Sequence, residues 1–197
     1  MSLAKTGYTT TTAKNYLIDA ATVYTNVTYE AVAGFTGTLI GATQGGVSFK
    51  IEQNFRQAEV DGASHIAVKG NDFLESAAGT IVAKLKEITA ENLRKGLNGV
   101  IRAAAADEAP TGYQVLETKR ALTDTDYLEN IAIVGTLSGT TSPVICILDN
   151  PLCTGGIELA TEDKTEAVVE LTFEARADAA QLLVDAMPWR ILFPAIA

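Results

Sequence analysis

Histidine is the side chain that most often acts as a base near neutral pH, and this chain of 197 residues has one, His65. Ser64 precedes it, but two side chains adjacent in a loop rarely form a nucleophile–base pair, and no second histidine is present to serve instead. We therefore expect His65 to be an exposed or interface loop residue, and the protein not to be an enzyme.

The two cysteines are too few for a disulfide scaffold. Cys146 lies inside an apolar run and is expected to be a buried free thiol. Cys153 lies in a turn spanning residues 150–156, where a strained disulfide across the turn is the alternative. A metal site at these thiols is disfavoured, because His65 lies far away in the sequence.

Two further motifs have the composition of ligand sites without the right spacing. Glu158, Glu162 and Asp163 beside Lys164 do not follow an EF-hand pattern, which favours a solvated turn. The glycine-rich residues 41–46 lack the Lys-Ser/Thr ending of a phosphate-binding loop, and a strand follows them where a helix is needed. We expect no metal and no cofactor.

Composition narrows the class of protein. The chain is 47% hydrophobic and 20% charged, as is ordinary for a soluble globular domain. We expect a single domain over residues 15–197, preceded by a flexible threonine-rich arm at residues 1–14. The net charge of −9 disfavours binding to the phosphate backbone of nucleic acids. The sequence shows no signal peptide, and no apolar run approaches the ~20 residues of a membrane helix.

Two half-buried strands are the clearest elements that would position side chains. In residues 47–57, Val47, Phe49, Ile51 and Phe55 share one face, while Ser48, Lys50, Glu52, Asn54 and Arg56 share the other. In residues 80–88, Ile81, Ala83 and Leu85 face one way, and Lys84 and Lys86 face the other. Each strand therefore has an apolar face for a core and a charged face.

Residues 58–79, between these strands, show no helical or strand period and are predicted to be a long loop. Ordering that backbone costs roughly 20–40 kcal/mol. The large apolar side chains available are Val60, Ile66, Val68, Phe73 and Leu74. Their burial recovers at most about 15 kcal/mol. The loop is therefore expected to be mobile in a monomer and to become ordered against a partner.

The remaining pattern completes a mainly β fold. Residues 89–98 predict a helix capped by Thr89 and ended at Gly99, and residues 128–137 and 142–148 predict a hairpin with both faces covered. Residues 165–175 alternate as a strand, Asp178 caps a short helix through residue 186, and residues 188–194 form a last edge strand. About eight strands and two short helices indicate a β-sandwich or barrel with flanking helices.

Charged side chains should project from separate strand faces: Lys84 and Lys86 from one, and Glu166, Glu170 and Glu174 from another. Such faces are ordinarily solvated. The alternative is that one of them lines a channel or meets a neighbouring subunit.

Several segments resemble major tail tube proteins of long-tailed (siphophage-type) bacteriophages or prophages. These segments are residues 41–52 (GATQGGVSFKIE), 60–63 (VDGA), 68–70 (VKG), 85–93 (LKEITAENL), 127–132 (YLENIA) and 147–151 (ILDNP). The similarity runs from about residue 15 to residue 194, most of the chain.

The resemblance implies a β-sandwich-like tail-tube subunit with a flanking helix and a long inter-strand loop. Six subunits would form a ring around a continuous β-barrel, and rings would stack into a tube whose acidic lumen lets DNA pass without specific binding. The loop would reach the next ring or subunit through Val60, Asp61, His65, Ile66, Val68, Lys69, Phe73 and Leu74. The candidate tube-wall residues are Val47, Phe49, Lys50, Ile51, Glu52, Lys84, Leu85 and Lys86, although Lys50, Lys84 and Lys86 fit an acidic lumen poorly.

The resemblance also implies partners and a location. The subunit would bind copies of itself and other tail proteins, namely a tape measure, a tail terminator and a baseplate or tip protein. It would be assembled in the host cytoplasm and reside in the virion tail, without contact with a membrane. Two alternatives stay open: a monomeric β-sandwich module that binds a ligand such as carbohydrate, and the inner tube of a contractile secretion-type system.

Overall fold

The structure, a computed structural model, describes residues 6–62, 66–161 and 163–195. In chain order its strands are β1 (Leu17–Glu30), β2 (Gly34–Leu39), β3 (Thr43–Gln57), β4 (Asp72–Leu85), β5 (Gly99–Ala103), β6 (Gln114–Thr118), β7 (Asn130–Leu137), β8 (Pro143–Asp149), β9 (Leu152–Cys153), β10 (Val169–Glu174) and β11 (Trp189–Leu192). Helix α1 (Ala90–Leu97) follows β4, and α2 (Ala179–Leu183) follows β10. Short 3-10 turns, η1 (Thr12–Lys14) and η2 (Asp124–Asp126), complete the elements. The predicted mainly β class is confirmed.

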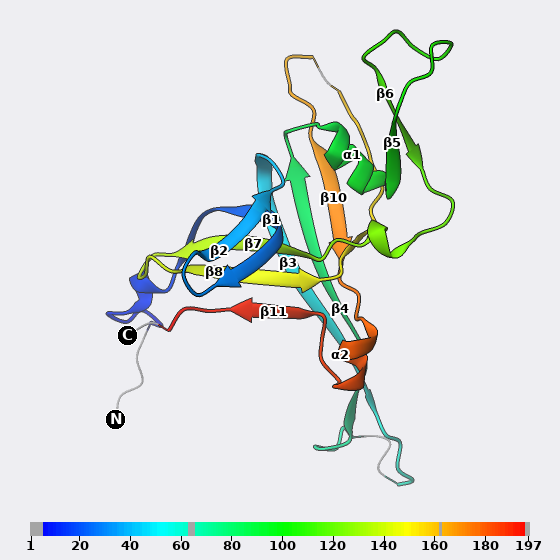
Figure 1. The fold of residues 1–197 in the computed structure, drawn as a ribbon. Coiled ribbons are helices and arrows are strands. Elements are labelled where there is room, and N and C mark those ends of the chain that lie inside the picture. The colour runs from blue at the N-terminus through cyan, green and yellow to red at the C-terminus, as the bar shows by residue number, and fades with distance from the viewer. Residues whose placement is uncertain (1–5, 63–65, 162, 196–197) are drawn as a thin grey trace.

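Two antiparallel sheets pack against each other. The five-stranded sheet has the order β11-β8-β7-β1-β2, and the four-stranded sheet has the order β3-β4-β10-β9. The main core lies between them and is fully buried at Val23, Ile131 and Leu148 on one side and at Ile81 and Phe173 on the other. A separate hairpin of β5 and β6 stands beside α1, at the end of the molecule opposite the β3–β4 turn (Figure 1).

Helix α1 forms where the sequence predicts it. The Thr89 side chain accepts a hydrogen bond from the Asn92 N–H at 3.1 Å, which satisfies one of the free donors of the first turn. Glu91 lies near the positive end of the helix and pairs with Arg94 at 2.7 Å. Asn98, with φ 47°, takes the left-handed conformation that ends the helix, so the predicted stop at Gly99 lies one residue too late.

The predicted hairpin of two apolar strands is confirmed as β7 and β8, with Ile131 opposite Leu148 and Val134 opposite Ile145. The last strand is also confirmed, because β11 lies at the edge of the five-stranded sheet against β8. Asp178 caps α2 as predicted, but the helix ends at Leu183. The alternating strand predicted at residues 165–175 is shorter than expected and begins at Val169.

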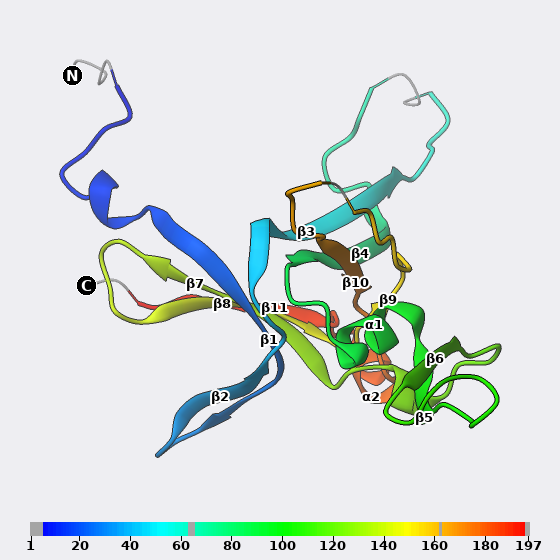
Figure 2. The same ribbon diagram turned by 90° about the horizontal axis from the view of Figure 1, so that it is seen from above.

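The prediction of a long loop over residues 58–79 is wrong in its extent. Strand β4 begins at Asp72, so Phe73 and Leu74 are strand residues that pair with Arg56 and Phe55, and the connection shrinks to residues 58–71. Phe55 keeps the phase of Val47, Phe49 and Ile51 along β3, but it is exposed rather than buried, because this part of the hairpin lies beyond the packed core. The hairpin of β3 and β4 therefore reaches well beyond the two packed sheets, as Figures 1 and 2 show.

Candidate assembly surface

The exposed face of the four-stranded sheet carries charges in pairs. Lys84 on β4 lies directly opposite Glu170 on β10, and their charged atoms are 3.3 Å apart. Lys86 lies 3.4 Å from Glu166, just before β10, and Lys50 on β3 lies 2.5 Å from Glu52. The lysine and glutamate faces that the sequence predicts separately are one face of one sheet.

The pairing changes the electrostatics expected of a wall built from these strands. Each of the three lysines at odds with an acidic lumen has a carboxylate within 3.4 Å, so this part of the face is close to neutral. The pKa of Glu166 lies below its usual range, because its own backbone N–H and the Lys86 ammonium hydrogen-bond to its carboxylate. All these side chains are between 41% and 71% exposed, so water screens the pairs and they contribute little to folding.

The opposite face of the same sheet belongs to the core, as predicted. Leu85 is fully buried, and Val47 and Phe49 pack against the core while half-buried. Ile51 is also half-buried. One sheet thus has an apolar face that holds the fold together and a polar face left to solvent.

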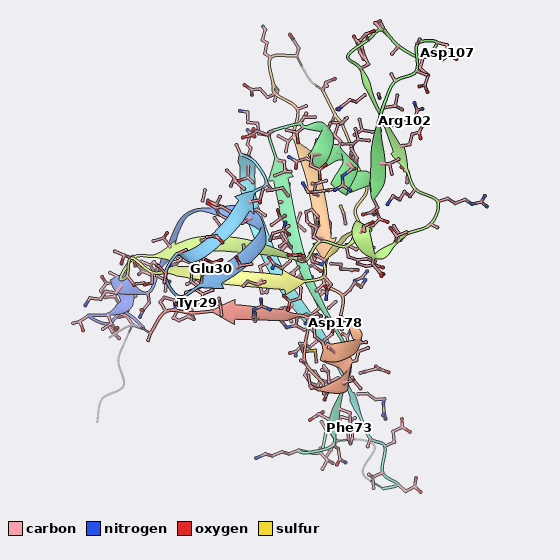
Figure 3. All side chains as sticks on the ribbon, viewed as in Figure 1. Tyr29, Glu30, Phe73, Arg102, Asp107 and Asp178 are labelled. Atoms are coloured by element: carbon pink, nitrogen blue, oxygen red, sulfur yellow. The ribbon has the colours of Figure 1, made fainter. Side chains whose placement is uncertain are left out.

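The β3–β4 hairpin gathers apolar side chains that the described residues leave exposed. Phe55 and Phe73 are more than half exposed, with Arg56 stacked 5.9 Å above the Phe73 ring centre. Figure 3 shows Phe73 far out on the hairpin, beyond α2.

The turn of the hairpin is similarly uncovered. Val60, Ile66 and Val68 are exposed and line a shallow hollow of about 190 Å³. Asp61 and Lys69 are exposed beside them, and His65 lies outside the described residues.

Both edges of the four-stranded sheet are open over part of their length. In the described part of the chain, β3 pairs with β4 along one edge and no strand pairs with its other edge. At the other end of the sheet, β9 pairs with β10 at Phe173 and Glu174, and the Thr154 N–H donates to the Thr172 carbonyl at 2.8 Å. Unpaired strand edges present rows of backbone N–H and C=O groups to a neighbouring chain.

A second apolar feature, absent from the sequence analysis, lies on the outer face of the five-stranded sheet. The sheet curls, so that side chains from four strands surround a groove of about 480 Å³. Its lining residues are Tyr24, Val27, Phe35, Thr36, Gly37, Val134, Pro143 and Ile145. The signal in the sequence was the near-continuous apolar runs of β7 and β8. These runs predicted that both faces of the β7–β8 hairpin are covered, yet the four-stranded sheet covers only one of them.

The chemistry-bearing residues form no catalytic arrangement among the described residues. Cys146 and Cys153 are both free thiols, so the disulfide alternative is wrong. Burial raises the pKa of each thiol, which keeps it protonated near neutral pH. No group of three metal-ligating side chains occurs in the described residues, and Glu162 of the acidic cluster lies outside them. The described helices include none long and apolar enough to cross a membrane.

Neither a protein-family model nor a curated protein matches the sequence. Among solved structures, a chain of the "Virion of native gene transfer agent (GTA) particle" is 11% identical with a TM-score of 0.36, over 80% of this chain and 92% of that chain. A chain of the 6-fold symmetrised anti-feeding prophage (AFP) baseplate is 13% identical with a TM-score of 0.41, over 90% of this chain and 95% of that one. A chain from the "Tail of empty GTA particle", with C6 symmetry, is 13% identical with a TM-score of 0.33, over 89% and 96%.

Proposed function

We propose that this protein is the structural subunit of a phage-type tail tube, in which six copies form a ring and rings stack into a conduit for DNA. The observation that carries the proposal is the four-stranded sheet. It has one buried face, one polar face of paired charges, and a fifteen-residue edge strand whose outer edge is unpaired within the described residues.

In the proposed ring, neighbouring subunits join at the open edge of β3. A free edge of that length is a template for adding another strand, and monomeric proteins normally shorten, charge or cover such edges. The edge strand of one copy can add to the β10 side of the next copy, where β9 covers only the Phe173 end. Repeating this contact closes a continuous barrel whose polar face is turned to the lumen.

The β3–β4 hairpin supplies the contact between rings. Phe55, Phe73, Val60, Ile66 and Val68 are exposed at the part of the molecule that extends beyond both sheets. Burying a side chain of this size contributes about 1.5–3 kcal/mol, so a handful of them is enough for a stable contact between stacked subunits. His65 belongs to the same proposed contact by its place in the sequence.

The proposed lumen is neutral where its lysines are paired, while the chain as a whole carries a net charge of −9. Both properties disfavour attachment of the DNA backbone, which requires unpaired cations. The ends of the tube would meet a tape measure, a tail terminator and a baseplate or tip protein. Assembly would take place in the host cytoplasm, and the finished tube would lie in the virion tail.

Sedimentation velocity and negative-stain microscopy of the purified protein test the proposal. We expect rings or tubes from the native chain. In Ile66→Asp, which introduces a charge at an exposed hairpin position without disturbing the core, we expect the tubes to be lost while single rings persist. Leu122→Asp, at another exposed apolar position far from the hairpin in sequence, is the matched control and should assemble normally. A native protein that stays monomeric at high concentration, or an Ile66→Asp variant that assembles like the native chain, would contradict the proposal.

A further inference from the structure

Two pairs of residues in this chain place glycine directly after an aspartate or an asparagine, Asp61–Gly62 and Asn98–Gly99. Such pairs can cyclise spontaneously, because glycine has no Cβ to keep its backbone nitrogen away from the side-chain carbonyl carbon of the preceding residue. The product is a succinimide ring, and its hydrolysis leaves an isoaspartyl residue, whose main chain runs through Cγ. In an unfolded chain the asparagine pair reacts faster, because ammonia is lost more readily than water.

The first pair, Asp61–Gly62, forms a turn in the connection between β3 and β4, on the hairpin that reaches beyond the packed sheets (Figure 2). Both residues are exposed, and a Cβ built on Gly62 would have no atom of the described residues within 4 Å. Cyclisation requires the Asp61 side chain and the following peptide group to rotate toward each other. The described surroundings of this pair leave room for that rotation.

The second pair, Asn98–Gly99, ends helix α1 and begins β5, where both residues are held. Asn98 Nδ2 donates a hydrogen bond to the Cys153 carbonyl at 2.7 Å, and its backbone N–H bonds to carbonyls of the last helical turn. Gly99 is buried and lies directly opposite Thr118 in β6, so close that a Cβ at Gly99 would clash with the Glu117 carbonyl oxygen. Cyclisation here would require breaking the hydrogen bond of the Asn98 amide and the end of the helix.

We propose that Asp61 is a site of spontaneous isomerisation to isoaspartate in the folded subunit, and that the fold protects Asn98 from the same chemistry. The order of reactivity is then the reverse of the order expected for the two pairs in an unfolded chain. The modification needs no enzyme and no bound ligand, and it changes the main chain at the turn of the β3–β4 hairpin.

Water is the only co-reactant of this modification. The Gly62 backbone nitrogen forms a bond to Asp61 Cγ, and the side-chain hydroxyl leaves with the amide hydrogen as water. A second water then adds to one of the two ring carbonyls. Attack at Cγ restores aspartate, whereas attack at the main-chain carbonyl carbon breaks its bond to the Gly62 nitrogen and leaves the chain linked through Cγ. The isoaspartyl form keeps a carboxylate and its charge, but it inserts a methylene group into the main chain.

Peptide mapping of the aged native protein tests the proposal. Trypsin releases Asp61 in the peptide of residues 57–69 and Asn98 in the peptide of residues 96–102. After prolonged incubation well below the melting temperature, we expect isoaspartate in the first peptide, detected by an isoaspartyl methyltransferase and by altered retention at unchanged mass. Deamidation in the second peptide should be at least ~10-fold slower, because the helix end must open first. Equal rates in the folded protein, or an absence of isoaspartate at Asp61, would overturn the proposal.

Incubation in urea and two variants serve as controls. In urea the Asn98 peptide should react faster than the Asp61 peptide, because the fold no longer holds either pair, and an unchanged order would contradict protection by the fold. Asp61→Glu should abolish the modification, since the larger ring that glutamate would form closes far more slowly. Asp61→Asn should react faster than the native aspartate in the folded chain, and an unreactive Asp61→Asn variant would also contradict the proposal.

The consequence for assembly rests on the proposed function. The added methylene lies between Val60 and Ile66, which belong to the proposed contact between rings, so modified subunits should be depleted from tubes and enriched in the unassembled fraction. The isoaspartate content of pelleted tubes and of the supernatant measures this. Equal contents in both fractions would leave the modification standing and remove this turn from the contact. Tubes formed by an aged chain without isoaspartate would leave the tail-tube function standing and overturn the modification.

Discussion

The side chain of Asn130 on β7 binds both backbone polar groups of Val27 on β1. Its Oδ1 accepts a hydrogen bond from the Val27 N–H at 2.7 Å, and its Nδ2 donates to the Val27 carbonyl at 3.0 Å. The register of β1 shifts at this point, between Thr25 and Thr28, and Asn26 takes a φ of 54°. The amide thus replaces the strand partner that the irregularity removes, and it fixes the wall of the groove at Val27.

Asn130→Ala should destabilise the fold by about 2–4 kcal/mol, because it leaves a buried N–H and a buried C=O without partners. Asn130→Asp should be at least as harmful, since its carboxylate would face the Val27 carbonyl. Urea denaturation measures both changes. Asn54→Ala, which removes an exposed hydrogen bond to Ser76 at 3.0 Å, is the control and should cost less than about 1 kcal/mol.

Gly96→Ala should destabilise the protein even though alanine favours helices by about 1 kcal/mol over glycine. A Cβ at Gly96 on α1 would lie 2.6 Å from Ile157 Cγ1 and 2.8 Å from Leu171 Cδ2. Leu171 is fully buried, so we expect a net loss of ~1–3 kcal/mol. Gly7→Ala has nothing within 4 Å of the new Cβ and should leave the melting temperature unchanged. A gain in stability for Gly96→Ala would contradict this prediction and would show that the Ile157 and Leu171 side chains can move aside at little cost.

Stability should fall in acid through the buried carboxylate of Asp126. Lys119 hydrogen-bonds to it at 2.6 Å and, with the Thr123 N–H and hydroxyl, lowers the pKa of Asp126 from its ordinary 3.8. A depressed folded-state pKa means that this contribution is complete above about pH 4 and is lost as the pH falls through the folded-state value. Asp126→Asn should therefore be less stable than the native chain at pH 7 and differ less from it below pH 3. Denaturation at a series of pH values would reveal a constant difference if the pairing had no role.

Freeing the lysines of the four-stranded sheet should make the protein bind DNA. In Glu166→Gln with Glu170→Gln, Lys86 and Lys84 lose their partners, so DNA affinity should rise and its salt dependence should steepen. Folding stability should change little, because solvent screens these exposed pairs. Fluorescence anisotropy of labelled DNA, with salt varied, is the measurement.

The control for that experiment changes the net charge equally at other sites. Glu91→Gln with Glu117→Gln removes partners of Arg94 on α1 and Arg102 on β5, away from the four-stranded sheet. Equal DNA binding by both double variants would mean that net charge matters and that the pairs on this face do not.

Local sequence patterns predicted the elements whose own residues determine their secondary structure. Thr89 and Glu91 marked the start of α1, and the apolar runs on either side of residues 138–141 marked the β7–β8 hairpin. The first half of β4 carries no such pattern, because Asp72 to Ala78 does not alternate. Pairing with β3 makes it a strand, and that pairing is a property of the hairpin rather than of the segment.

The candidate assembly surface was predictable only in part. The two-faced character of β3 and β4 followed from alternation, and it was enough to propose a wall. The pairing of Lys84 with Glu170 depends on β10 lying next to β4, and the groove depends on how far the five-stranded sheet curls. Both are consequences of long-range topology that no window of the sequence contains.

If the open edge of β3 binds another subunit as proposed, the stability of the fold depends on the subunit concentration as well as on the sequence. A contact made by the folded subunit and not by the unfolded chain adds free energy that grows with the logarithm of subunit concentration. A dilute subunit would then unfold more readily than the same subunit at high concentration. The proposed tube would thus hold its own building blocks in the folded state, and breaking it into single subunits would expose each of them to unfolding and proteolysis.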